Sequence, residues 1–267
     1  MDHWSLHARQ WALVGPPLRP CAADVAIATA ELAAWTAAHR RAPRALLLGV
    51  TPELATLAWP AGTALTAIDR APAMIGALFT ATPDRRAVVA DWRALPLRAA
   101  AIDVALGDGC LPNLAFPDGY RAFARELGRV LAPGGALVTR LFVSPPVREA
   151  LGAVADALAA GAIGSFHAFK WRLAMAVAPD DRNVRVAAIW EAFAALVPDR
   201  AALARATGWP AAEIATIDAY RDSARVYAFP TLDETRAALG DALVETACRV
   251  PAYELGDRCP SLTLRAK

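Results

Sequence analysis

The stretch PDGYRAFARELGRVLAPGGALVTRLF, residues 117–142, decides the fold of this chain. Its apolar side chains recur with the period of one helix face, and they are Tyr120, Phe123, Leu127, Val130 and Leu131. We therefore predict a helix over 118–131, opened by Pro117. The turn Pro133-Gly134-Gly135 ends this helix, and the apolar run after it predicts a strand over 135–142.

Short apolar runs alternate with helical segments back to residue 44. The expected elements are strand 45–50, helix 52–59, strand 63–68, helix 71–80, strand 87–90 and strand 102–107. Such alternation is typical of a doubly wound, mostly parallel sheet with helices on both faces. Near the other end, Thr231 and Glu234 form a capping box that opens helix 232–239, and two strands follow at 243–250 and 261–265.

The alternation is interrupted after Pro145-Pro146, where roughly eighty residues predict helices only. These helices are expected at 147–159, 184–197, 199–207 and 211–221, before a strand-like segment at 225–229. We divide the chain into a helical extension (1–43), a core (44–146), a helical insertion or lid (147–228) and a closing segment (229–267). Within the extension, we predict a helix over 23–39, and Trp4 and Trp11 would share a face if 2–12 were helical.

Composition excludes several classes of protein. Mean hydropathy is +0.31, which excludes a disordered chain, yet no uncharged apolar window reaches the length of a membrane span. The net charge is +2, from 28 basic and 26 acidic residues, and no basic run exceeds two, which argues against nucleic-acid binding. Four scattered cysteines without a C-x-x-C pair, and a start without a secretory signal, favour a cytoplasmic protein.

The first turn after a strand, within LLLGVTPEL at 46–54, suits an anionic or polar ligand. A strand ends at Gly49, Thr51 can cap the next helix, and Pro52 opens it. The second strand ends in Asp69, twenty residues beyond Gly49, where nucleotide-binding sheets place a carboxylate for ribose hydroxyls. The alternative for Asp69 is a solvated residue at a strand end.

Two further turns carry groups that could contact a nucleoside. Asp91 could accept from an exocyclic amine, and Trp92 offers an aromatic surface, although a core tryptophan beside a turn aspartate is the alternative. Gly107 and Gly109 let the backbone approach a ligand, with Asp108 between them. In the first turn, Pro52 lacks an N–H and Glu53 would repel a pyrophosphate, so a ligand with adenosine but no phosphate fits better than NAD or FAD.

The order and spacing of these residues resemble the class I S-adenosylmethionine-dependent methyltransferases. The strongest marker is FARELGRVLAPGGALVTRLF at 123–142, which is similar to the helix, "RVLxPGG" turn and strand of that family. The resemblance covers 44–142 and 231–267. It implies a seven-stranded Rossmann-like sheet completed by an antiparallel strand pair, S-adenosylmethionine as cofactor, and methyl transfer as activity.

The resemblance assigns the methionine end of the cofactor to Gly49, Val50 and Thr51. The family has an acid where this chain has Leu47, and that acid helps to hold the ammonium of the cofactor. Glu53, in the same turn, is the candidate to replace it, the alternative being a residue that only favours a helix start.

The adenosine end is likewise assigned by resemblance. Asp69 would bind the ribose hydroxyls, Arg70 and Met74 would flank the adenine, and Asp91 with Trp92 would border it, the amine pairing with Asp91.

The resemblance places Gly107 and Asp108 near the reactive methyl group. Asp108 and His167 are the candidate bases, although methyl transfer needs a base only when the nucleophile carries a proton of high pKa. His167 lies in SFHAFKWRL at 165–173, which a solvated amphipathic helix explains nearly as well. No metal site is expected: His3 and His7 are spaced like ligands, but nothing completes a site, and we interpret both as surface residues.

We therefore expect methyl transfer to a small or medium-sized acceptor covered by the insertion. A non-catalytic binding or scaffold protein on a degenerate methyltransferase fold is the alternative, motivated by the altered first turn. A nucleotide-dependent oxidoreductase is disfavoured by Pro52 and Glu53. A homodimer is left open.

Overall fold

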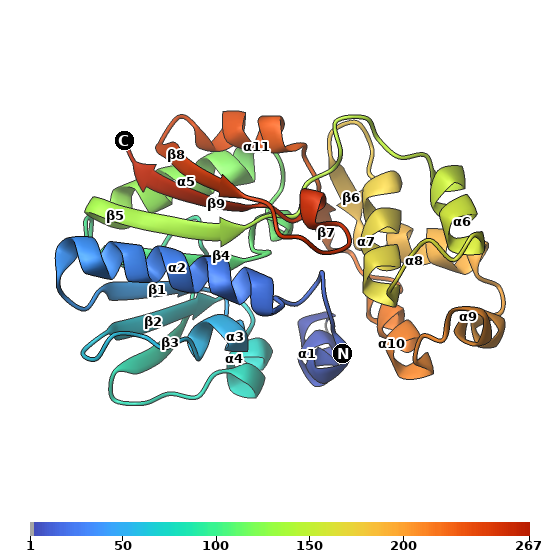
Figure 1. Cartoon of the computed structure of the whole chain (residues 1–267), viewed down its shortest axis with the longest axis horizontal. Coiled ribbons are helices and arrows are strands. Elements are labelled where there is room, and N and C mark those ends of the chain that lie inside the picture. Colours follow the sequence, from blue (N-terminus) through green and yellow to red (C-terminus); the bar gives the residue numbers. More distant parts are fainter. Residues whose placement is uncertain (1–2) are drawn as a thin grey trace.

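The computed structural model describes residues 3–267, and these contain a seven-stranded sheet flanked by helices and a separate helical unit (Figure 1). The order of the strands is β3-β2-β1-β4-β5-β9-β8. Neighbours from β3 to β5 pair in parallel, whereas β9 pairs antiparallel with both β5 and β8. This arrangement confirms the predicted α/β class with a doubly wound, mostly parallel sheet.

The strands lie close to the segments expected from the sequence. Their bounds are β1 (Arg44–Leu48), β2 (Ala64–Asp69), β3 (Arg85–Val89), β4 (Ile102–Asp108), β5 (Leu131–Arg140), β8 (Leu243–Arg249) and β9 (Ser261–Ala266). The buried runs of β1, β2 and β4 are almost entirely apolar because helices cover both faces of the sheet.

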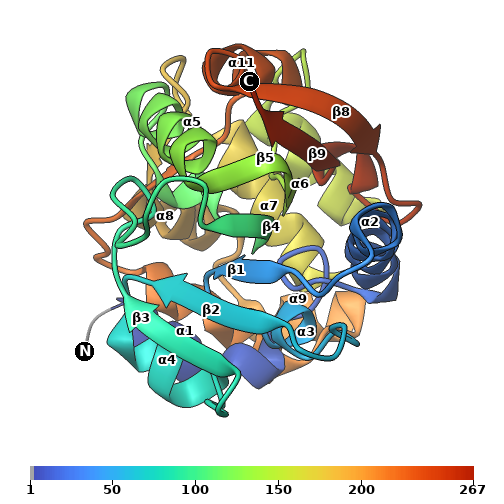
Figure 2. The same ribbon diagram turned by 90° about the vertical axis from the view of Figure 1, so that its left-hand side faces the viewer.

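Each face of the sheet has its own core. One face packs against α2 (Ala22–His39), α3 (Pro52–Ala55) and α4 (Pro72–Leu78), and the other against α5 (Asp118–Val130) and α11 (Leu232–Leu239). Figure 2 shows the two layers of helices on opposite sides of the strands. The amphipathic pattern of α5 and the capping box of α11 are both present as predicted, with Thr231 Oγ1 accepting from the Glu234 amide at 3.2 Å. Helix α3 is shorter than expected and ends at Ala55.

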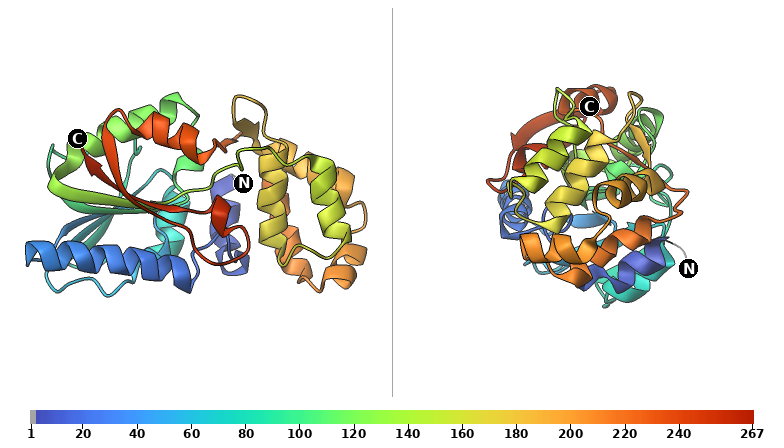
Figure 3. Two further views of the ribbon diagram at one scale, coloured as in Figure 1. Left: turned by 45° about the horizontal axis from the view of Figure 1, so that its top comes forward. Right: turned by 90° about the vertical axis from the view of Figure 1, so that its right-hand side faces the viewer.

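The unit between β5 and α11 lies apart from the sheet in Figure 3, and it has its own aromatic core. Its helices are α6 (Leu151–Ala159), α7 (Phe166–Ala176), α8 (Val186–Leu196), α9 (Arg200–Thr207) and α10 (Ala211–Ala215), followed by a 3₁₀ turn, η3 (Thr216–Tyr220). The two connections to the sheet run side by side, because the Ser144 amide donates to the Pro230 carbonyl at 2.9 Å.

One expectation about this unit is wrong, and one alternative explanation is excluded. It is not helical throughout, since β6 (Asn183–Arg185) precedes α8 directly and pairs antiparallel with β7 (Val226–Ala228). Helix α7 is not a solvated amphipathic helix either: nine of its eleven residues are buried, Lys170 and Trp171 among them. The charges of Lys170 and Arg172 suggested solvent, but they lie in packed surroundings, the second paired with Glu149.

The N-terminal segment crosses the end of the sheet. Helix α1 (His3–Arg9) and the 3₁₀ turn η1 (Trp11–Leu13) lie at the end where the parallel strands finish, and α1 contacts both α4 and η3 (Figure 1). Within the described residues, no helix has the length and apolar character needed to cross a bilayer.

Candidate functional site

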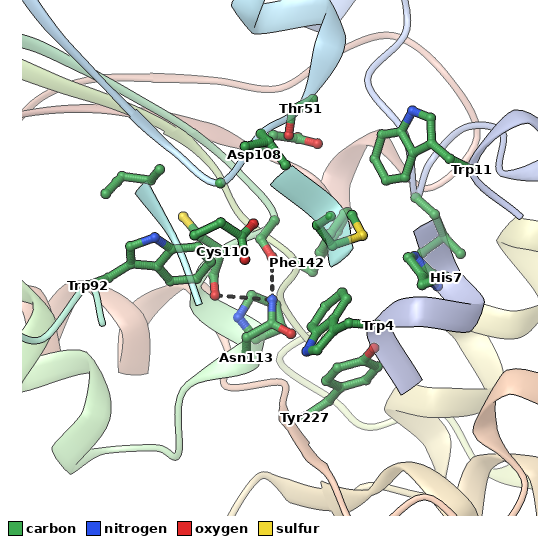
Figure 4. A pocket seen from close by; sticks show the side chains of 18 of the residues that line it. Trp4, His7, Trp11, Thr51, Trp92, Asp108, Cys110, Asn113, Phe142 and Tyr227 are labelled. Atoms are coloured by element: carbon green, nitrogen blue, oxygen red, sulfur yellow. Dashed lines mark hydrogen bonds between the residues drawn. The ribbon is translucent and has the colours of Figure 1, made fainter. Parts of the chain in front are cut away.

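A cavity lies at the carboxyl ends of β1, β2 and β4, where an open α/β sheet places its ligands. The sheet side is formed by turns that follow strands, and these contribute Leu48, Gly49, Val50, Thr51, Asp69, Met74, Trp92, Asp108, Gly109, Cys110, Pro112 and Asn113. The opposite side comes from the N-terminal segment, the end of β5 and the insertion, through Trp4, His7, Trp11, Leu18, Phe142, Trp171, Tyr220 and Tyr227. Figure 4 shows Trp92 facing Trp4, His7 and Trp11 across the space.

The first turn depends on glycine. Gly49 has φ of +90°, a conformation that residues with a side chain rarely adopt, and its amide donates to the Ile68 carbonyl at 2.8 Å. A Cβ atom there would lie 3.8 Å from Asp69 Oδ2 and 3.9 Å from the Trp92 ring. The turn therefore brings bare backbone, a carboxylate and an indole to one place.

Asp69 ends β2 and turns its carboxylate into the cavity. Oδ1 accepts from the Ala71 amide at 2.8 Å, and burial raises the pKa of Asp69 above its ordinary value. Met74, in α4, is buried beside it. The Trp92 indole donates to the Ile68 carbonyl at 2.6 Å, which fixes its ring against this wall.

Asp91 and Arg70 lie at the edge of this arrangement. Asp91 does not line the cavity: it pairs with Arg93 at 2.6 Å and with Arg70 at 3.2 Å, and the Arg93 guanidinium holds the pKa of Asp91 well below its usual range. Arg70 lines an adjoining hollow together with Trp4 and Arg225.

Asp108 forms a buried ion pair. Its Oδ1 lies 2.5 Å from Nε of Arg140, on β5, and both side chains are almost completely buried. The Arg140 guanidinium also donates to the Pro17 carbonyl at 2.7 Å and to the Tyr253 hydroxyl at 3.0 Å. Burial nevertheless raises the pKa of Asp108, with Arg140 opposing the shift.

Glu53 lies behind the first turn and is not part of the cavity lining. One of its oxygens is paired with Arg19, and the other, Oε2, is buried without a hydrogen-bond partner. Gly107 is also behind the wall, since a Cβ there would lie 2.8 Å from Cys110 Sγ and 3.2 Å from Thr139 Oγ1. The structure therefore places Gly49, Asp69 and Asp108 in the cavity lining. Glu53 and Gly107 lie behind the lining residues.

His167, the second candidate base, is not among the residues that line the cavity. It is buried in α7, its Nε2 donates to the Leu13 carbonyl at 2.8 Å, and burial lowers its pKa to about 4. A neutral imidazole held in this way joins the insertion to the N-terminal segment.

Residues from α1 and η1 were missed as site residues. His7, interpreted as a surface residue, lines the cavity between Trp4 and Trp11, whereas the side chain of His3 lies outside the described part of the chain. The spacing of three and four between these side chains marks one helix face, but nothing in the sequence says what that face meets. Across the described residues, no group of three or more His, Cys, Asp or Glu is placed to hold a metal ion.

A family model matches the central part of the chain. Residues 46–139 match a family model described as a methyltransferase domain. A search of functionally characterised proteins by sequence finds no match.

Several solved structures share the fold over nearly the whole chain. A putative Zn-dependent alcohol dehydrogenase from Rhodobacter sphaeroides has a TM-score of 0.64 at 12% identity, covering 99% of this chain and 97% of that one. The CcbJ methyltransferase from Streptomyces caelestis has a TM-score of 0.56 at 14% identity, and the match covers 100% of this chain and 98% of that one. The 1,6-didemethyltoxoflavin-N1-methyltransferase from Burkholderia thailandensis has a TM-score of 0.51 at 17% identity, and the match covers 92% of this chain and 79% of that one. That structure contains 1,6-didemethyltoxoflavin and S-adenosylhomocysteine. At these identities the likeness concerns the fold alone.

Proposed function

We propose that the chain transfers a methyl group from S-adenosylmethionine to a small or medium-sized acceptor, a proposal supported by the match of residues 46–139 to a methyltransferase domain model. The observation that carries the proposal is the cavity at the strand ends. One side offers the Gly49 turn, Asp69 and Asp108, and the other side is aromatic. A donor and an acceptor can therefore meet in one space.

The residues of the sheet side fit an adenosine. The Asp69 carboxylate, at the end of β2 and beside the Gly49 turn, is placed to accept from both ribose hydroxyls. Met74 and the fixed Trp92 ring provide apolar surface for a purine, with Arg70 at the rim. Asp91 would reach the adenine amine only by exchanging its bonds to Arg93, so we assign it a peripheral role.

The methionine end would lie by Gly49, Val50 and Thr51. The corner behind this turn contains three carboxylates, those of Asp24, Glu53 and Asp108, against the two guanidinium groups of Arg19 and Arg140. This excess of one negative charge favours a ligand that carries an ammonium. The unpartnered Oε2 of Glu53 supports our inference that Glu53 takes the place of the acid absent at Leu47.

S-Adenosylmethionine supplies a methyl group on a sulfonium, whose S–CH₃ bond breaks with its electron pair staying on sulfur as an acceptor lone pair forms the new bond. The chain's own part is to align the two reactants and exclude water, which by itself lowers the barrier. Asp108 lies on the cavity wall and can hold a proton released by the acceptor, whereas His167 does not line the cavity and is bonded to the Leu13 carbonyl. We propose that the insertion, 147–228, and the extension, 1–43, cover the acceptor.

The test is a thermal-shift series on the purified full chain. S-Adenosylmethionine and S-adenosylhomocysteine should both raise the melting temperature, because a ligand that binds the folded state stabilises it. NADH should not. Stabilisation by NADH alone would favour an oxidoreductase, and stabilisation by none of the three would favour a scaffold on a degenerate fold.

A further inference from the structure

Two hollows adjoin the cavity at the ring of Trp4. The inner hollow continues the cavity lining through Trp4, Asp69, Trp92 and Asn113, and it adds Arg70, Leu114 and Arg225. The outer hollow is lined by Trp4, Arg70, Arg225 and residues 71–73. Since Trp4 lines all three spaces, a ligand whose reactive end lies in the cavity can extend past this ring and reach the two arginines.

Arg225 comes to this place from the insertion, directly before β7. Its guanidinium carbon lies 5.3 Å from the centre of the Trp4 ring, which is a cation–π distance. The residue is half-buried, and no carboxylate of the described residues lies within ion-pair distance of its guanidinium. The ring therefore holds this positive charge at the hollow without neutralising it.

Arg70 brings a second positive charge from the sheet side, where it follows β2. Its contact with Asp91 is a single hydrogen bond of 3.2 Å, whereas Arg93 donates to both oxygens of that carboxylate, at 3.0 and 2.6 Å. Arg93 thus neutralises Asp91 by itself. About half of the Arg70 side chain is exposed, so its remaining N–H groups are accessible to a ligand.

The charge changes sign along the path from the cavity to the outer hollow. Among the described residues, the charged side chains that line the cavity are the carboxylates of Asp69 and Asp108. The linings of the two hollows carry two guanidinium groups against the one carboxylate of Asp69. A cationic sulfonium is therefore favoured inside and an anionic group outside, and this polarity would orient an acceptor that carries a negative charge.

We infer that the methyl acceptor carries an oxyanion, a carboxylate or a phosphate, which Arg70 and Arg225 bind beside Trp4 while the reactive atom of the acceptor lies in the cavity. This inference rests on the proposed function, which places the methyl donor against the sheet side. The fork of N–H groups on a guanidinium matches the two oxygens of either anion. The Trp4 ring supplies a flat apolar surface for the carbon frame between the two ends.

Four probes share a naphthalene frame and differ in charge. They are 2-naphthoate and 2-naphthyl phosphate (anionic), 2-naphthamide (neutral) and 2-naphthylmethylammonium (cationic). Each is titrated by calorimetry into the full chain saturated with S-adenosylhomocysteine. We expect both anions to bind roughly tenfold tighter than 2-naphthamide at low salt, and to lose most of this preference at about 1 M salt, where charges are screened within about 3 Å.

The tighter of the two anions identifies a carboxylate or a phosphate as the group that the arginines bind. Equal affinities for 2-naphthoate, 2-naphthyl phosphate and 2-naphthamide overturn the inference. Tightest binding of 2-naphthylmethylammonium overturns it as well.

The variant Arg225→Gln removes the charge and keeps a polar side chain. It should weaken 2-naphthoate roughly fivefold and leave 2-naphthamide within about twofold. Arg98→Gln is the matched control, because Arg98 is exposed and precedes β4, at the opposite end of the sheet, yet its loss changes the net charge equally. Both affinities should stay unchanged in Arg98→Gln. An equal loss for the two probes in Arg225→Gln means that only packing on Trp4 was lost, and it overturns the inference.

Charge reversal gives an independent reading. Arg225→Glu should weaken 2-naphthoate further and should bind 2-naphthylmethylammonium more tightly than the wild type does. If the Arg225 variants do not fold, Arg70→Gln removes the other charge and should also weaken 2-naphthoate selectively. If Arg225→Gln weakens S-adenosylhomocysteine as much as it weakens 2-naphthoate, the arginine serves the donor and the inference is wrong.

The outcomes also separate this inference from the proposed function. If S-adenosylhomocysteine binds but no probe shows a preference for negative charge, the acceptor class is wrong while the function stands. If 2-naphthoate binds through Arg225 but S-adenosylhomocysteine does not bind, the function fails, and the inference fails with it as a statement about a methyl acceptor.

Discussion

The carboxylate of Asp108 and the guanidinium of Arg140 are 2.5 Å apart at the ends of adjacent parallel strands, each with about one-twentieth of its side chain exposed. Around this pair, Tyr253 donates to Asp24 at 2.9 Å and accepts from Arg140 at 3.0 Å. The network joins α2, the central sheet and the loop between β8 and β9 beneath the cavity. Arg140 is the one cation that contacts both carboxylates of this network, so removing it leaves Asp24 and Asp108 buried without it.

Arg140→Met should destabilise the fold by roughly 3–5 kcal/mol, since it leaves Asp108 buried without its partner. Urea denaturation measures the change in the free energy of unfolding. Arg185→Met is the control, because Arg185 and Glu191 form an exposed pair at 3.5 Å that is worth about 1 kcal/mol or less. Equal effects of the two substitutions would show that burial adds nothing to the Asp108 pair.

Asp69→Ala should weaken binding of S-adenosylhomocysteine by about 1.5–3 kcal/mol, because two ribose hydroxyls lose a charged acceptor. Isothermal calorimetry on the folded variant measures the loss. Asp84→Ala, at an exposed aspartate before β3, should bind like the wild type. An unchanged affinity in Asp69→Ala removes Asp69 from the ribose site.

Glu53→Gln should reduce affinity for S-adenosylhomocysteine far more than affinity for methylthioadenosine, which lacks the amino-acid end. The reason is that Oε2 of Glu53 is buried without a hydrogen-bond partner while the other oxygen is paired with Arg19, and the proposed function assigns this carboxylate to the ammonium. Arg19→Gln is the matched control, since it breaks the same ion pair but keeps the carboxylate. If the ratio of the two affinities does not move in Glu53→Gln, the residue stabilises the N-terminal segment and has no contact with the ligand.

The stability of the protein should depend on pH through Lys170. This lysine is buried between the rings of Phe166 and Tyr220, 3.3 Å from Thr216 Oγ1, and burial lowers its pKa from 10.5 to about 7. Between those values the unfolded state binds more protons than the folded state, so stability rises with pH.

Relative to Lys170→Met, the wild type should therefore gain about 2 kcal/mol from pH 7 to pH 9, as measured by urea denaturation at both values. All other titrating groups are common to both proteins and cancel in the difference. His167, with its pKa lowered to about 4, titrates below this window. Lys267 is exposed, so the difference in unfolding free energy between the wild type and Lys267→Met should not change with pH. If the difference between the wild type and Lys170→Met does not change with pH either, Lys170 is hydrated in the folded protein.

Local signals predicted the sheet well because its elements carry their own boundaries. Helix α5 has a clear apolar face between Pro117 and the Pro133-Gly134-Gly135 turn, and α11 begins at its capping box. Strand β6 lacked any such signal, since Asn183–Arg185 runs straight into α8 without a turn residue. Only its pairing with β7, far along the chain, makes it a strand.

The site divides in the same way. Gly49, Asp69 and Asp108 were predictable because each ends a strand or directly follows one, and the ends of parallel strands meet at one edge. The partners of Glu53 and His167 were not, because Arg19 and the Leu13 carbonyl lie 34 and 154 residues away in sequence. The wall made by Trp4, His7 and Trp11 depends on where α1 docks, which is a tertiary contact with no local cause.

Gly109 and Phe142 share one space: a Cβ on Gly109, at φ of +56°, would lie 2.4 Å from the Phe142 ring, which in turn packs on Trp171. The Phe142 ring thus occupies the space that a side chain on Gly109 would need. Across a set of homologous sequences these two positions should covary, with glycine at the first wherever the second is aromatic, and a larger residue at the first only where the second is small. A homologue in which Phe142 is replaced, which reshapes the aromatic side of the cavity, should therefore also carry a substitution at Gly109, in the turn after β4.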